Sequence, residues 1–141
     1  MTLRPDLIRG GIIAKLKASS TITDELLSPG ADEIRQSQWQ GREFSYPCVR
    51  VFIGTITPMQ PDCNRWEIEF SIGIFSEEAS SYQADRISGI IHEVLHSKSF
   101  SQTVQSQDLR FSLWTNSIVP AIRRDEKTWR SELLMRATVS G

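Results

Sequence analysis

The second half of the chain shows a regular alternation of large apolar and polar or small residues. From Trp66 to Ile74 every second residue is large and apolar, which predicts a half-buried β-strand. The same period of two, bounded by turn-forming residues, predicts three further strands. These strands lie at residues 48–53 (after Pro47), 109–113 and 129–139.

Two segments instead show the period of an amphipathic helix. Pro5 suits a first helical position, and apolar residues recur at helical spacing behind it, which predicts a helix over Pro5–Lys17. Residues 79–96 form the second predicted helix, because its aliphatic residues fall within one arc of a helical wheel. We expect the first helix to end at Ser19-Ser20 and the second near Ser97-Lys98-Ser99. A short helical turn is expected at residues 23–27.

The remaining segments are predicted to be connections. Residues 31–46 are polar and irregular, with room for a short strand near Ile34, and residues 54–64 and 115–128 are predicted as long hairpin tips. The resulting order of elements favours an α+β fold: a four-stranded, mainly antiparallel sheet with two helices packed on one face. We expect one domain over residues 1–141. The strand residues expected to be buried are Val49, Val51, Ile53, Trp66, Ile68, Phe70, Ile72, Leu109, Phe111, Leu133 and Met135.

Composition narrows the class of protein without identifying it. Hydrophobic residues make up 39% and aromatic residues 9% of the 141 residues, which is too apolar for a disordered chain. The formal net charge of −1 argues against a dedicated DNA-binding protein. No run is long and apolar enough for a membrane span, and the first residues lack a secretory signal core, so we expect neither.

The two cysteines are expected to be reduced. If the first hairpin turns near Pro58-Met59, Cys48 faces roughly Glu69 and Cys63 faces roughly Gly54 across the strand pair. At about 3.3 Å per residue the sulfurs are then about 20 Å apart, which is beyond disulfide reach.

One segment, His92-Glu93-Val94-Leu95-His96, matches the H-E-x-x-H signature of zinc hydrolases. On a helical wheel, His92 and His96 lie about 150° from the centre of the apolar arc, on a face predicted to meet solvent or a partner. A catalytic zinc site would instead present both histidines into a cleft. We therefore reject His92, Glu93 and His96 as a metal or catalytic site, and expect no cofactor.

No other motif in the sequence points to catalysis. The sequence has no G-x-S-x-G, P-loop or G-x-G-x-x-G motif, and it has too few Cys and His residues for a structural zinc site. Glu67 and Glu69 share a strand face, where they are either solvated or paired with a neighbouring subunit. Arg123-Arg124 is either a solvated turn or a contact for an acidic partner or a polyanion.

In its order of elements the chain resembles the tail terminator and tail-completion proteins of tailed bacteriophages. The matching parts are the N-terminal helix, the Pro-bounded strand Tyr46-Pro47-Cys48-Val49-Arg50-Val51, the alternating strand of residues 65–76, the amphipathic helix ending at His96 and two closing strands. The resemblance implies a structural, non-enzymatic virion protein at the tail–neck junction, assembled in the bacterial host cytoplasm. Another self-associating neck or tail connector protein is the alternative.

The resemblance also implies partners and contact residues. The expected partners are further copies of the chain in a six-membered ring, the tail tube protein and a neck or connector protein, with DNA only as passing cargo and no membrane. Trp39 and Met59 are the expected apolar anchors of subunit contacts, because exposed Trp and Met favour interfaces. The candidates for a charged rim or lumen are Arg42, Arg123, Arg124 and Lys127.

Overall fold

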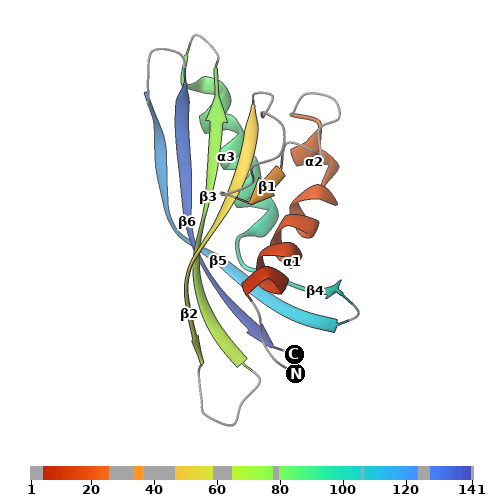
Figure 1. The fold of residues 1–141 in the computed structure, drawn as a ribbon. Coiled ribbons are helices and arrows are strands. Elements are labelled where there is room, and N and C mark those ends of the chain that lie inside the picture. Colours follow the sequence, from red (N-terminus) through yellow and green to blue (C-terminus); the bar gives the residue numbers. More distant parts are fainter. Residues whose placement is uncertain are drawn as a thin grey trace.

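The computed structural model describes residues 5–25, 34–36, 47–58, 65–77, 80–105, 107–123 and 128–140. Helices and strands are mixed along this part of the chain, as an α+β fold requires, and Figure 1 shows the helices on one side of a strongly twisted sheet. The elements are α1 (Pro5–Lys17), α2 (Ser20–Thr23), β1 (Ile34–Gln36), β2 (Cys48–Pro58), β3 (Arg65–Ser76), α3 (Tyr82–Leu95), β4 (Lys98–Val104), β5 (Gln107–Arg123) and β6 (Trp129–Ser140).

Within the described residues the strands form one six-stranded sheet in the order β1-β2-β3-β6-β5-β4. The five long strands pair antiparallel, as predicted, and the short β1 pairs parallel to β2. The predicted number of four strands is wrong. Strand β1 corresponds to the short strand expected near Ile34, whereas β4 was not predicted. Its sequence is mostly polar, and only Phe100 and Val104 pack against the core from this edge strand.

Strands β2 and β5 run further than their alternation predicted, so residues 54–58 and 115–123 are strand and not hairpin tip. Bulges explain the error, since an extra residue interrupts the period of two. One bulge lies between Ile53 and Ile56. There Gly54 passes so close to β3 that a Cβ would lie 2.9 Å from the Glu69 carbonyl oxygen. In β5, register shifts follow Thr115 and Val119.

The helices differ from prediction mainly where they begin. Helix α1 has the predicted bounds, but α3 begins at Tyr82 and not at residue 79, which is outside the described residues. Ser76 belongs to β3, where its hydroxyl donates a hydrogen bond to Gln83 Oε1 at 2.6 Å. Helix α3 ends as expected, because Ser97 adopts a left-handed conformation (φ 57°) and β4 follows directly. The short helix α2 begins at Ser20, earlier than the turn expected at residues 23–27.

The hydrophobic core lies between one face of the sheet, here called the inner face, and the two long helices. Helix α1 packs on β1, β2 and β4, and α3 packs on β3, β5 and β6. Nine of the eleven strand residues predicted to be buried are buried, but Ile53 and Trp66 are only partly so. Trp66 lies near the start of β3, and Figure 1 shows that this end of the β2–β3 pair extends past α1 and α3.

The register of the first hairpin also differs from the expected one. Cys48 lies opposite Phe75 and not opposite Glu69, because the strands pair only as far as Pro58 and Trp66 and because the bulge shifts the register. Cys48 is a fully buried thiol, as expected of a reduced cysteine. Cys63 is outside the described residues.

Candidate functional site

The face of the sheet opposite the helices, here called the outer face, carries a charged cluster at its centre. Arg136 of β6 lies opposite Glu69 of β3 and Trp114 of β5. Its guanidinium group lies 3.0 Å from the Glu69 carboxylate and 3.3 Å from that of Glu67. The two glutamates are therefore paired within their own chain, an arrangement that the sequence alone did not indicate. All three side chains are more than a third exposed, so the cluster stabilises the fold only slightly.

Aromatic rings and arginines cover the outer face near the start of β2. The guanidinium carbons of Arg50 and Arg130 lie 5.2 and 5.7 Å from the centre of the Phe75 ring, and Arg130 lies 5.6 Å from that of Phe52. Gly73 allows the rings to approach, because a Cβ there would be 3.0 Å from Phe52 and 3.2 Å from Phe75. Phe75 is buried even though it is on the outer face, so this cluster is a packed surface.

Apolar side chains lie on three successive outward-facing rows of the register, from the row next to the Arg136 cluster to the row that holds Phe75 and Arg130. A row here means residues paired across neighbouring strands. Leu134, which is 39% exposed, shares its row with Phe52. Val119 is on the next row, and Ile122, which is 60% exposed, is on the third. We call these four residues the outer apolar strip. A hollow of about 340 Å³, lined in part by Phe52, Leu134 and Asn116, adjoins it. Exposed apolar side chains beside a hollow are typical of a surface that binds another protein.

The structure describes one of the six residues predicted from the sequence to contact other subunits or DNA. Arg123 is exposed at the end of β5, with its guanidinium carbon 5.4 Å from the centre of the Trp129 ring. Trp39, Met59, Arg42, Arg124 and Lys127 are outside the described residues. The outer apolar strip and the Arg136 cluster were missed. The alternation in β6 predicts that Leu134 and Arg136 point to the outer face. Only the register of β6 with β3 and β5 shows which residues lie beside them.

The two histidines of the H-E-x-x-H segment bind strand β5 and do not face open solvent, so this part of the prediction is wrong. Thr115 Oγ1 lies 2.8 Å from His92 Nδ1, and the Thr115 backbone N–H donates to His96 Nδ1 at 2.9 Å. The rings stack with their centres 4.7 Å apart. The wheel analysis failed here because β5 extends over this side of α3, where Asp85 also accepts a hydrogen bond from the Ala121 N–H at 2.7 Å. Glu93 is exposed.

The described part of the chain contains no group of three or more His, Cys, Asp or Glu side chains placed to hold a metal ion. No helix among the described residues is long and apolar enough to cross a membrane. The arrangement on the outer face offers contact surface: paired charges, packed rings and exposed aliphatic groups.

Comparisons with known proteins identify the fold. No protein-family model matches the chain, and no curated protein sequence matches it significantly. Among solved structures, a chain from the virion of a native gene transfer agent (GTA) particle matches with a TM-score of 0.64 at 15% identity, over 96% of both chains. A second solved chain, known only by a sequence identifier, matches with a TM-score of 0.61 at 11% identity, over 99% of this chain and 97% of its own length. This chain therefore shares its whole fold with a component of a gene transfer agent virion.

Proposed function

We propose that this protein is a structural component of a phage-like particle, and that it forms the tail terminator or tail-completion ring. Such a ring caps the finished tail tube and joins it to the neck on the head side. The observation that carries the proposal is the match to a gene transfer agent virion chain over 96% of both chains. The finer assignment to a tail terminator or tail-completion ring is supported by the order of elements in the sequence, which resembles that family. The role is structural, with DNA only as passing cargo.

The outer apolar strip is the surface best suited to contact a neighbouring copy. A ring of identical subunits is built from heterologous contacts, in which one patch meets a different patch on the next subunit. Leu134 and Ile122 provide exposed apolar area, and the Arg136 cluster next to Leu134 provides a polar rim. We propose that the second patch includes the β2–β3 end, with Met59 and Trp39 as anchors. Arg42, Arg123, Arg124 and Lys127 then form the charged rim or lumen.

The test is genetic and uses the phage or prophage that encodes the chain. A ring that caps the tube stops its polymerisation, so deletion of the gene should give tails of abnormal length that fail to join heads in electron micrographs. Tails of normal length, joined to heads in normal numbers, would contradict the proposal. Tails of normal length that stay detached would instead favour the alternative, a neck or connector protein.

Complementation tests the outer apolar strip itself. We expect Leu134→Asp to fold and yet fail to restore normal particles, because a charge on the strip would be buried unpaired in the ring contact. Tyr82→Asp is the matched control, since Tyr82 is 71% exposed at the start of α3, on the helix side of the sheet. It should restore particles fully. Equal behaviour of the two variants would exclude the strip as the subunit contact.

A further inference from the structure

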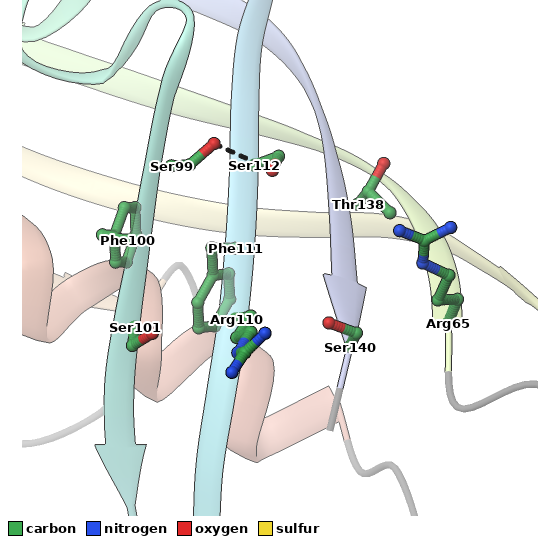
Figure 2. Close-up of a pocket in the computed structure, with 9 residues that line it drawn as sticks. All are labelled: Arg65, Ser99, Phe100, Ser101, Arg110, Phe111, Ser112, Thr138 and Ser140. Carbon is green, nitrogen blue, oxygen red and sulfur yellow. Dashed lines mark hydrogen bonds between the residues drawn. The ribbon is translucent and has the colours of Figure 1, made fainter.

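A hollow of about 420 Å³ on the outer face combines two arginines with a set of hydroxyl groups (Figure 2). Arg65 of β3 and Arg110 of β5 both lie opposite Ser140 of β6, one on each side. Their Cα atoms are therefore about two strand spacings, or about 10 Å, apart. Beside them the lining includes five hydroxyl side chains: Ser99, Ser101, Ser112, Thr138 and Ser140.

Most of the hydrogen-bond donors that line this hollow have no partner among the described residues. Ser99 and Ser112 bond to each other at 3.0 Å, but neither arginine forms an ion pair with any described carboxylate. Of the acidic residues on the outer face, Glu67 pairs with Arg136, whereas Asp108 lines an adjoining hollow together with Arg110, Ser101 and Ser140. Asp108 Oδ1 accepts a hydrogen bond from the Thr103 hydroxyl at 2.6 Å, and its charge limits the affinity of the hollow for anions.

We infer that this hollow, here called the Arg65–Arg110 hollow, binds the phosphate groups of a nucleic-acid backbone. Guanidinium groups bind phosphate oxygens through paired hydrogen bonds, and serine and threonine hydroxyls add contacts that carry no sequence information. One backbone phosphate, like one carboxylate, has only two charged oxygens, so a ligand that engages both arginines must present successive anionic groups. The hollow is open, with both arginines exposed, so a backbone that presents successive phosphates can reach both. The inference does not rest on the tail role proposed above.

The predicted binding is weak and has a defined salt dependence. Two phosphate contacts give a slope of about −1.8 for log K against log salt, because each contact contributes about −0.9 on duplex DNA. Affinity should then fall about 12-fold between 50 and 200 mM salt. Arg110→Gln should halve the slope, so that the same change in salt weakens binding only about 3.5-fold. A net charge of −1 is compatible with two contacts but not with many.

The experiment measures fluorescence anisotropy of a labelled 20-base-pair duplex against the full chain at 20–200 mM salt. Arg65→Gln/Arg110→Gln should abolish the binding seen at 20 mM salt. The matched control is Lys17→Gln/Arg86→Gln, which removes two exposed charges from the helices and should bind within twofold of the unmodified chain. No binding at 20 mM salt, or equal loss in both double variants, would overturn the inference.

Competition distinguishes the sources of the anion. Pyrophosphate should displace the duplex and shift the amide NMR signals of Thr138 and Ser140, whereas polyglutamate at equal charge should displace it much less. If polyglutamate competes as well as pyrophosphate, the hollow recognises acidic protein surface and the inference is wrong. If pyrophosphate shifts these signals but the duplex does not bind, the assignment to a nucleic-acid backbone is likewise wrong.

Discussion

Gly11 provides the sharpest test of how α1 packs on the sheet. In an exposed helix interior, replacing glycine by alanine stabilises by about 1 kcal/mol. At this buried position an added Cβ would lie 2.5 Å from Cζ and 2.8 Å from Cε2 of Phe111. The Phe111 ring is 1% exposed and stacks on Phe100 with the ring centres 5.1 Å apart, so it has little room to move. Overpacking of this kind costs about 1–3 kcal/mol. Gly11→Ala should therefore lower the free energy of unfolding by about 1 kcal/mol, in spite of the better helix propensity.

Two other helical glycines are matched controls. Gly89 on α3 is exposed, and among the described residues nothing lies within 4 Å of its added Cβ, so Gly89→Ala should stabilise by about 1 kcal/mol. At Gly10 the nearest atom is Val104 Cγ1 at 3.4 Å, which is an ordinary contact. Gly10→Ala should therefore be neutral or mildly stabilising. Urea denaturation followed by circular dichroism measures the free energy of unfolding of all three variants. In thermal melts, the melting temperature should shift by about 3 °C for each kcal/mol.

A double-mutant cycle tests the stated cause. Phe111→Leu removes the ring atoms that the new methyl group would meet, so Gly11→Ala should be less harmful in that background by about 1 kcal/mol or more. If Gly11→Ala stabilises as much as Gly89→Ala, or if the two changes are additive, then the Phe111 ring does not pack against α1 and the core description is wrong.

Three further changes test other parts of the fold. Phe70→Asp should abolish folding, because an unpaired charge in this buried position costs several kcal/mol against a total stability of roughly 5–15 kcal/mol. A soluble variant that circular dichroism shows to be folded would mean that the two faces of the sheet are assigned the wrong way round. Thr115→Val should lower stability by about 1 kcal/mol by removing the hydroxyl that meets His92, and no change in the urea midpoint would mean that this contact contributes nothing. Arg136→Gln should cost at most about 1 kcal/mol at low salt, and a larger loss would show that its exposed ion pairs matter more than we argue.

The sequence predicts this fold well where a single period continues without interruption. The alternation from Trp66 to Ile74 identified β3 and four of its buried positions, although Trp66 itself is only partly buried. The apolar arc of α3 identified the helix and the side that packs on β3 and β6. Prediction failed where the period breaks or is weak. The bulge after Ile53 and those in β5 hid the true strand lengths, and β4 has too few apolar residues to be recognised as an edge strand.

The candidate site was harder to predict than the fold, because it depends on register. The sequence shows that Glu69 and Arg136 are outward-facing, but only the pairing of β3 with β6 places them opposite each other. The same is true of Arg65 and Arg110, which are 45 positions apart in the chain and become neighbours of Ser140 only in the folded sheet. His92 and His96 show the same limit, because the helical wheel placed them toward solvent or a partner, whereas Thr115 of the distant strand β5 contacts both.

The central claim, that the chain is a ring component of the virion, is tested most directly by counting it. Quantitative mass spectrometry of purified particles, with isotope-labelled peptides of this chain and of the tail tube protein as standards, gives copies per particle. The account predicts about six copies of this chain in each particle, the number in the proposed six-membered ring. Absence from the particles, or a copy number in the hundreds like that of a tube protein, would contradict it.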